Sequence, residues 1–279
     1  MKDDANISPI LKGETDKTIY GGYTCIGGRE EDQDCLLYDA ANGRQVFAVC
    51  DGMGGHAGGC IASTTAAKAL VDSLRRQKDI IPITEAIMSA VTEANDAVYR
   101  RSQEEPRLRG MGTTITLLVF DANAAYVTHV GDSRIYQLRK GRKIFRTFDH
   151  SMVFEQVAKK KMTEEEARVH PRSNMLSRAL GILPDIEIAV KKLDYRKDDR
   201  FILCCDGVWN TQPEKNIITM LTKYKDVNKT IMETRNVVEH IGQSSGNQYD
   251  NHTMIVVDMK TDSKYRRSIF TKIKNLFRK

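Results

Sequence analysis

The sequence predicts an α+β fold with antiparallel sheet, and three observations support this class. Ten short apolar or alternating runs, each bounded by Gly, Asp or Asn, are typical of strands. Two long segments, residues 59–78 and 84–104, carry apolar residues at helical spacing. The predicted strands between residues 113 and 147 follow one another too closely for crossover helices, so they pair antiparallel.

The remaining elements follow from the same periodicities. Strands are predicted at residues 20–26, 35–39, 45–50, 113–120, 124–130, 134–139, 142–147, 186–192, 200–205 and 253–258. Shorter helices are predicted at residues 151–159, 163–168, 214–223 and 227–242. One of them has a clear start, since Thr163 is a good N-cap and Glu166 follows three residues later.

Composition indicates a globular protein. The chain has 279 residues, of which 41% are hydrophobic and 29% charged. No apolar run approaches the ~18 residues of a membrane span, and the first residues are polar and acidic, unlike a secretory signal. We therefore expect a cytoplasmic protein. Its six cysteines show no CxxC spacing, which favours reduced core thiols over zinc or disulfide use.

The charge is unevenly distributed along the chain. Residues 264–279 contain seven basic side chains and no acid, so they account for the whole formal net charge of +6. The rest is near neutral and offers no basic aromatic platform for nucleic acid, so no nucleic-acid partner is predicted. As a helix, the segment has an apolar face formed by Ile269, Phe270, Ile273, Leu276 and Phe277. It suits an anionic membrane surface or an acidic partner, although a helix packed on the body and a solvated tail remain alternatives.

Five acids stand at the ends of predicted strands: Asp34, Asp51, Asp132, Asp206 and Asp250. Each alone has an ordinary explanation, because Asp beside Gly is common in turns. If the strand ends converge, the carboxylates repel one another unless cations are present. Clustered carboxylates and carbonyls are typical ligands of Mg²⁺ or Mn²⁺. The glycines after Asp51, beginning with Gly52, allow a backbone carbonyl to approach such an ion.

Arg29 precedes Asp34 by five residues and is a candidate phosphate ligand. A planar guanidinium can hold two phosphate oxygens at once. The alternative is a solvated charge in a polar loop, and the spacing alone does not separate the two.

Eight short motifs follow one another along the chain: Arg29-x-x-x-Gln33-Asp34, Asp51-Gly52-Met53-Gly54-Gly55-His56, Gly112-Thr113-Thr114, Gly131-Asp132-Ser133-Arg134, Asp149-His150-Ser151, Ser177-Arg178-Ala179-Leu180-Gly181, Asp206-Gly207-Val208-Trp209 and Asp250-Asn251. In content and order they resemble the motifs of PP2C-type (PPM) metal-dependent Ser/Thr protein phosphatases, with bacterial-like variants. The resemblance covers about residues 20–258.

The resemblance implies an α/β/β/α sandwich of two mainly antiparallel sheets flanked by helices. It divides the chain into an N-terminal extension (1–19), a phosphatase domain (20–260) with a mobile flap at about 150–185, and a basic amphipathic tail (261–279). Asp51 would bridge two ions, Mn²⁺ or Mg²⁺. Asp206 and Asp250 would complete one site, and Asp34 and the Gly52 carbonyl the other. Asp132 with Asp206 matches a third, looser site, where Asn210 is a poorer ligand than the acid of some members.

The implied reaction hydrolyses phosphoserine or phosphothreonine without a covalent intermediate. Two ions lower the pKa of a shared water, which supplies hydroxide at neutral pH. Hydroxide attacks phosphorus in line with the leaving oxygen, while Arg29 and the ions stabilise the equatorial oxygens. His56 is either the acid that protonates the leaving oxygen or a structural cap of the following helix. His129 and His150 are predicted to be structural.

Other functions would require other residue patterns. A cysteine phosphatase needs a Cys followed by a phosphate loop and an Arg six residues on, and no Cys has that spacing. An aspartyl-nucleophile phosphatase needs a D-x-D pair directly after a buried strand, whereas polar residues precede Asp32 and Asp34. A catalytically weak phosphoprotein-binding regulator remains as the alternative. Expected partners are phosphoproteins and a Ser/Thr kinase with its substrates, and we expect a monomer, with peripheral membrane contact through the tail.

Overall fold

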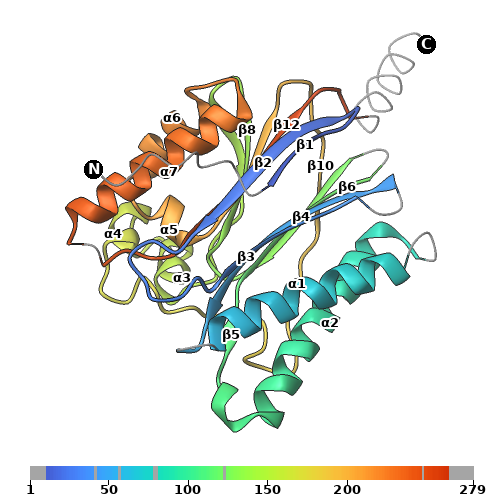
Figure 1. The fold of residues 1–279 in the computed structure, drawn as a ribbon, viewed down its shortest axis with the longest axis vertical. Coiled ribbons are helices and arrows are strands. Elements are labelled where there is room, and N and C mark those ends of the chain that lie inside the picture. Colours follow the sequence, from blue (N-terminus) through green and yellow to red (C-terminus); the bar gives the residue numbers. More distant parts are fainter. Residues whose placement is uncertain are drawn as a thin grey trace.

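The computed structural model describes residues 11–40, 43–55, 58–77, 81–121, 124–246 and 248–263. Two six-stranded sheets lie face to face in the centre of the molecule, with helices outside each (Figure 1). The predicted α+β class and the α/β/β/α sandwich are confirmed.

The first sheet has the strand order β1-β2-β12-β11-β8-β9, and all its neighbouring strands are antiparallel. Its strands are β1 (Leu11–Glu14), β2 (Thr18–Cys25), β12 (His252–Met259), β11 (Arg200–Cys204), β8 (Arg134–Arg139) and β9 (Arg142–Arg146). The second sheet has the order β10-β7-β6-β4-β3, with β5 paired to β4. Its strands are β10 (Lys191–Leu193), β7 (Ala125–Val130), β6 (Ile115–Phe120), β4 (Gln45–Met53), β3 (Asp34–Asp39) and β5 (Gly112–Thr113).

Helices cover the outer faces of the sandwich (Figure 1). The long helices α1 (Gly58–Arg76) and α2 (Ile83–Glu104) lie against the second sheet, followed by a short 3₁₀ turn (Pro106–Leu108). Helices α6 (Glu214–Thr222) and α7 (Val227–Ser244) lie against the first. Three short helices, α3 (Met152–Ala158), α4 (Glu164–Arg168) and α5 (Asp206–Trp209), gather at one end of the sheets. The predicted capping box of Thr163 and Glu166 is present at the start of α4.

Side-chain alternation in β4 explains why two cores form. Phe47 and Val49 point into the core between the sheets, whereas Val46, Ala48 and Cys50 point toward α1 and α2. Successive residues of a strand face opposite sides of the sheet, so a strand buried on both faces is apolar throughout. The run from residue 46 to 50 has this pattern.

Three differences from the predicted elements have physical causes. Residues 186–190 do not pair with another strand, and only β10 forms from the predicted strand at 186–192. The alternating apolar side chains of residues 186–190 instead pack on the core between the second sheet and helices α1 and α2. The predicted strand 113–120 is interrupted at Thr114, whose backbone N–H bonds to the Asp51 carbonyl. Strand β1, within residues assigned to the N-terminal extension, pairs with β2 as an edge strand. Its sequence, LKGE, has too little apolar periodicity to be found.

Candidate metal centre

The five strand-end acids come from both sheets and converge at one end of the sandwich. Asp34 begins β3 and lies directly opposite Asp51 of β4 in the antiparallel register. Asp206 begins α5 just beyond β11, and Asp250 stands two residues ahead of β12, the neighbour of β11. Asp132 lies in the turn between β7 and β8, one strand of each sheet. The predicted metal ligands are therefore brought together by strand pairing.

The thiol of Cys205, which the sequence did not indicate as a site residue, lies beside Asp34 and Asp51. Their carboxylate oxygens and the sulfur of Cys205 all lie within 4.8 Å of one another. Cys205 Sγ donates to Asp34 Oδ2 at 3.1 Å and accepts from the Thr253 amide at 3.1 Å. Cys205 is the last residue of an apolar run, a position typical of a core thiol. Only its hydrogen bond to Asp34 identifies Cys205 as part of the site.

The pKa shifts show that the carboxyl groups of this cluster repel one another. Burial raises the pKa of Asp34 to about 7 and that of Asp206 to about 6, with nearby carboxylates adding to both shifts. Burial, followed by repulsion from Asp34 and Asp206, raises the pKa of Asp51 well above its usual range. Burial and Asp206 do the same for the pKa of Asp132. Carboxyl groups under such mutual repulsion are stabilised as anions by cations bound among them.

The donor set fits hard divalent ions. Asp34 Oδ1 is buried and accepts no hydrogen bond from any residue that the structure describes. A buried carboxylate oxygen without a donor is costly, and a bound cation would satisfy it. Carboxylate oxygens are the ligands that Mg²⁺ and Mn²⁺ prefer. Asp34, Asp51, Asp206 and Asp250 are thus suited to hold such ions, with Asp132 adjacent to Asp206.

Gly52 can be only glycine in this backbone. A Cβ there would lie 2.1 Å from the Gly59 carbonyl oxygen at the start of α1 and 2.6 Å from that of Gln33. The Gly52 amide donates to the Gln33 carbonyl at 3.1 Å, which ties β4 to the loop before Asp34. The glycine-rich stretch therefore allows three backbone segments to meet beside the acids.

The Thr113-Thr114 pair fixes the backbone of Asp51. Thr113 Oγ1 donates to the Asp51 carbonyl at 2.9 Å, and the Thr114 amide donates to the same oxygen at 2.8 Å. Thr114 Oγ1 in turn accepts from the Asp51 amide at 3.0 Å and bonds to Ser133 Oγ at 2.7 Å. These threonines occur in the sequence motifs, but their role as supports of Asp51 becomes visible only in the structure.

Arg29 lies at the edge of the cluster, in a pocket of about 430 Å³ that also includes Gln33, Gly55 and Asp250. Its Nη2 donates to Asp250 Oδ2 at 2.8 Å, so it forms an ion pair with a predicted metal ligand. Asn251 holds the same loop. Its Nδ2 donates to the carbonyls of Ile26 at 2.8 Å and Glu31 at 2.9 Å, and its Oδ1 accepts from the Gln33 amide at 2.9 Å.

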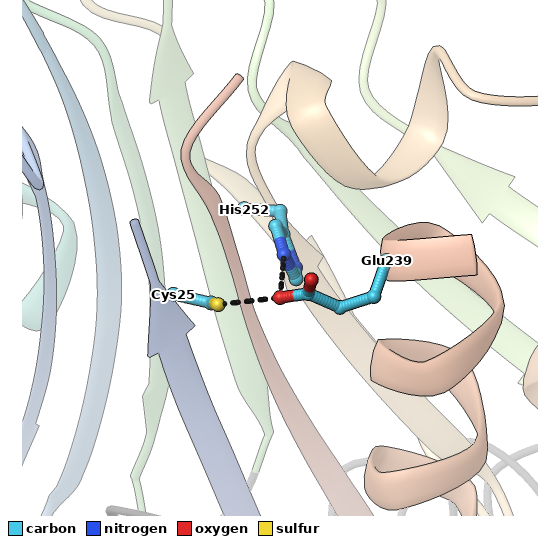
Figure 2. A group of neighbouring side chains, drawn as sticks. All are labelled: Cys25, Glu239 and His252. Atoms are coloured by element: carbon cyan, nitrogen blue, oxygen red, sulfur yellow. Dashed lines mark hydrogen bonds and ion pairs between the residues drawn. The ribbon is translucent and has the colours of Figure 1, made fainter. Parts of the chain in front are cut away.

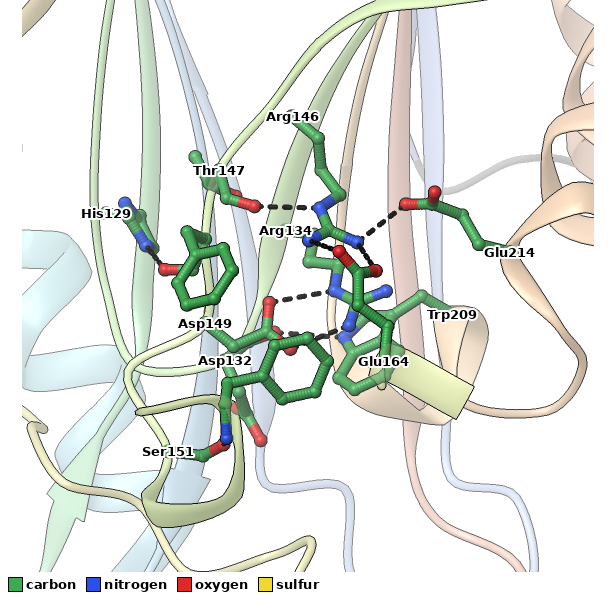
Figure 3. A network of polar contacts seen from close by, with 12 residues as sticks. His129, Asp132, Arg134, Arg146, Thr147, Asp149, Ser151, Glu164, Trp209 and Glu214 are labelled. Carbon is green, nitrogen blue, oxygen red and sulfur yellow. Dashed lines mark hydrogen bonds and ion pairs between the residues drawn. The ribbon is translucent and has the colours of Figure 1, made fainter. Parts of the chain in front are cut away.

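Figure 3 shows a buried polar network that connects Asp132 to the predicted flap. Trp209 Nε1 donates to the Asp132 carbonyl at 3.0 Å. The guanidinium of Arg134 lies 3.3 Å from the centroid of the Trp209 ring and makes two bonds to Asp149, at 2.8 and 2.7 Å. Asp149 immediately precedes the flap, so Arg134 links the turn of Asp132 to the flap base.

The flap segment, residues 150–185, is attached at several points. Isolated bridges join Ser151 to Leu176 and Thr113 to Leu180. Arg146 of β9 bonds both oxygens of Glu164 at the start of α4, at 2.6 and 3.0 Å (Figure 3). A pocket of about 280 Å³ between the flap and α7 is lined by Asn174, Asp206, Asn210 and Asp250, among others. Asn210 Oδ1 is buried there and has no hydrogen-bond partner among the described residues.

Of the three histidines singled out from the sequence, the structure describes His129 and His150. His56 lies outside the described residues. His129 and His150 stack with ring centroids 4.4 Å apart, and His129 Nε2 contacts the Phe148 carbonyl at 2.8 Å. Burial lowers the pKa of His129, and it lowers the pKa of His150 to about 4. Both rings are therefore neutral at pH 7, and they pack against each other where β7 meets the start of the flap.

Within the ranges that the structure describes, no helix combines the length and apolarity needed to cross a membrane.

Comparisons with known proteins agree with this geometry. Residues 21–260 match the protein phosphatase 2C family. The chain is 30% identical over 233 residues to the serine/threonine phosphatase stp of Listeria monocytogenes, which covers 82% of this chain and 90% of that protein.

Solved structures give the same result. The serine/threonine phosphatase PstP of Mycobacterium tuberculosis matches with a TM-score of 0.76 and 30% identity, over 88% of this chain and 99% of that one. The catalytic domain of PstP in complex with two manganese ions matches with a TM-score of 0.74 and 30% identity, over 87% and 98% of the two chains. The resemblance drawn from the motifs is confirmed, and with it the enzyme class of a serine/threonine protein phosphatase. With its paired sheets and converging acids, the chain belongs to the protein phosphatase 2C family.

Proposed function

We propose that this phosphatase hydrolyses phosphoserine and phosphothreonine in proteins at a two-metal centre held by Asp34, Asp51, Asp206 and Asp250. The observation that carries the assignment of residues is the convergence of these carboxyl groups on Asp51, beside a buried Asp34 oxygen that has no hydrogen-bond donor among the described residues. Asp51 is central, since the charges of Asp34, Asp206 and Asp250 all act on it. Asp51 would therefore hold the ions, with the Gly52 carbonyl as a neighbouring ligand.

When bound, Mn²⁺ or Mg²⁺ supplies Lewis-acid charge and lowers the pKa of water, so that hydroxide is available near neutral pH. Arg29 binds two phosphate oxygens and orients phosphorus toward the carboxylates. Asp132 with Asp206 offers a further, weaker position for a cation, and Asn210 adds a neutral oxygen there. His56 is a candidate donor of the proton that the leaving oxygen takes up.

The decisive experiment measures turnover of p-nitrophenyl phosphate. We expect activity with Mn²⁺ or Mg²⁺, loss with EDTA, and loss in Asp51→Asn, Asp206→Asn and Asp250→Asn. A matched control is Asp185→Asn, an exposed acid on the flap. Normal turnover by a folded Asp51→Asn variant would remove Asp51 from the site. No turnover by the wild type, together with binding of phosphoprotein, would favour the phosphoprotein-binding regulator.

The cellular role is part of the proposal. Substrates are proteins phosphorylated by a Ser/Thr kinase, and the enzyme acts as a cytoplasmic monomer in signalling. The basic segment at residues 264–279 lies outside the described residues. Its composition supports peripheral contact with an anionic membrane or an acidic partner. Phosphoproteomics of a deletion strain would identify the substrates.

A further inference from the structure

A second cluster of possible metal ligands lies apart from the carboxylate centre, between the first sheet and α7 (Figure 2). Cys25 ends β2, His252 begins β12, and Glu239 projects from α7 toward both. Glu239 Oε1 lies 2.8 Å from Cys25 Sγ and 3.2 Å from His252 Nε2. All three donor atoms lie within 4.8 Å of one another.

We propose that Cys25, Glu239 and His252 form a Zn²⁺ site. Sulfur, imidazole nitrogen and carboxylate oxygen are the three donor types that zinc combines, whereas the acids around Asp51 offer mainly oxygen. A Cys25 thiolate and the Glu239 carboxylate would neutralise the two charges of the ion. The sequence gives no zinc signal, because these ligands come from three distant segments rather than from a CxxC pair.

The residues around the cluster orient these ligands as supporting residues do in zinc proteins. The second ring nitrogen of His252, Nδ1, is 3.1 Å from the Tyr23 hydroxyl, which leaves Nε2 directed toward Glu239. The second oxygen of Glu239 accepts from the Tyr249 hydroxyl at 2.5 Å. Such outer contacts fix the ring and the carboxylate before an ion binds.

One member of the cluster is partly open to solvent. The Glu239 side chain is 24% exposed, whereas Cys25 and His252 are buried. A pocket of about 520 Å³ is lined by Gly27, Gly28, Arg29, Gln243 and Tyr249, and the last two contact Glu239 Oε2. With three protein ligands, a water molecule would complete the four-coordinate shell of the ion.

The charges around Cys25 allow the exchange of a proton for an ion. Without metal the thiol keeps its proton and donates it to Glu239. When zinc binds, sulfur bonds to the ion and the proton passes to solvent. Arg235 Nη2 lies 3.6 Å from Cys25 Sγ and favours the thiolate, although its charge also opposes the cation. Two anionic ligands outweigh that single guanidinium.

The position of the cluster places the proposed ion beside the pocket of Arg29, where it would join three segments of the chain. Cys25 leads into the loop that carries Arg29, and His252 follows Asp250 by two residues. Zinc would fasten both segments to α7 through Glu239. It is a site additional to the proposed Mn²⁺ or Mg²⁺ centre and does not depend on that assignment.

Cobalt titration of the Mn²⁺-loaded, full-length protein tests the proposal, because a Co²⁺–thiolate bond gives a charge-transfer band in the near ultraviolet. We expect a band that saturates at one Co²⁺ per chain, is removed by Zn²⁺, and is lost in Cys25→Ser. Glu239→Gln should weaken Co²⁺ binding at least tenfold, and Tyr23→Phe by about 10–100-fold. Cys35→Ser, a half-buried thiol of β3, is the matched control and should keep the band.

Two outcomes would overturn the proposal: no band in the wild type, or a band that survives Cys25→Ser and disappears in Cys205→Ser, which would place the metal at the carboxylate centre.

A measurement on the wild type alone guards against misfolded variants. Zn²⁺ should slow alkylation of Cys25 at least tenfold, as followed by peptide mapping, while Cys60 reacts at an unchanged rate. Equal rates for Cys25 with and without Zn²⁺ would also refute the site.

Discussion

Nη2 of Arg29 lies 2.8 Å from Oδ2 of Asp250, so the proposed phosphate ligand is paired with a proposed metal ligand. The two side chains are 57% and 41% exposed, and an ion pair this open contributes only about 0–1 kcal/mol. The pair therefore opens at little cost. A cation bound to Asp250 and a phosphate bound to Arg29 would replace it with two separate contacts.

Replacing Arg29 should separate phosphate binding from metal binding. We expect Arg29→Ala to lower kcat/KM by about 10–100-fold, because it removes a charged hydrogen-bond donor from the phosphate. Mn²⁺ affinity should stay the same or rise by less than about fivefold, since only an exposed pair with Asp250 is lost. Steady-state kinetics and Mn²⁺ titration of the same samples measure both quantities.

Arg29→Lys is the control for charge without bidentate geometry, and its kcat/KM should lie between those of the wild type and Arg29→Ala. A fall in Mn²⁺ affinity as large as that in Asp51→Asn would show that Arg29 supports the metal rather than the phosphate.

The metal-free protein should lose stability as pH rises. Burial and neighbouring carboxylates raise the pKa of Asp34 to about 7 and that of Asp206 to about 6, above the ordinary value of about 4. Between pH 4 and 7 these two groups therefore hold more protons in the folded chain than in the unfolded chain. Their contribution to stability is greatest below this range and falls as pH rises through it, by an amount on the order of a few kcal/mol.

Urea unfolding at pH 5 and pH 8 in EDTA measures this effect, and saturating Mn²⁺ should reduce or reverse it because the ions replace the protons. Asp34→Asn should flatten the pH dependence. Because the buried His129 and His150 contribute equally to both proteins, the comparison with Asp34→Asn isolates the carboxyl groups. An unchanged pH dependence in Asp34→Asn would mean that these carboxyl groups do not repel one another as the structure indicates.

The ion pair of Arg134 and Asp149 should be important for stability, because both side chains are almost fully buried. Asp149→Asn leaves the guanidinium without its counter-charge, at a cost of about 3–5 kcal/mol. Trp209, the only tryptophan of the chain, lies 3.3 Å from that guanidinium and reports on it by fluorescence.

We therefore expect Asp149→Asn to unfold at lower urea concentration, with a changed Trp209 emission in the folded state. Asp185→Asn, on the exposed part of the flap, should change neither. A stability loss below about 1 kcal/mol would show that the buried guanidinium finds other partners, such as Tyr136 at 3.2 Å.

The flap should loosen when its contact with β9 is removed. Glu164→Gln weakens the two hydrogen bonds that Arg146 donates to the Glu164 side chain. It should increase hydrogen exchange in α4 and raise KM more than it changes kcat. Glu165→Gln is the matched control, because Glu165 pairs with Arg168 within the same helix. Equal exchange in the two variants would mean that the Arg146 contact does not hold the flap.

The convergence of the strand-end acids could be predicted because their signals are local. An apolar run followed by Asp-Gly marks a strand end in the sequence itself, as at Asp51 and Asp206. The same holds for the two long helices, whose periodicity spans many turns.

Contacts between distant segments could not be predicted in this way. Cys205 meets Asp34 across 171 positions and Cys25 meets Glu239 across 214, and neither pair has a spacing that marks it. The Arg29 pairing with Asp250 also depends on two loops that only the sheet brings together. Tertiary packing decides such contacts, as it decided the length of β10.

The basic segment offers a final prediction, and the structure determines where the chain should be cut. Ser263 is buried, its amide donates to the Tyr195 carbonyl at 2.9 Å, and its hydroxyl accepts from the Tyr195 amide at 3.3 Å. The preceding Asp262 accepts from the Lys197 amide at 2.9 Å. Residues 262 and 263 thus contact the body. The truncated chain should therefore end at Ser263, because a chain that ends at residue 261 would also lose these contacts.

Chains lacking residues 264–279 should turn over p-nitrophenyl phosphate normally but fail to sediment with anionic liposomes at low salt. Each basic residue near such a surface contributes about 1 kcal/mol, and salt screens the attraction. The control is Ile273→Asn with Phe277→Asn, which interrupts the apolar face but keeps the net charge of the segment, so binding should weaken without vanishing. If the full-length protein stays in the supernatant, the membrane role is refuted. If the truncated chain unfolds, the segment packs on the body instead.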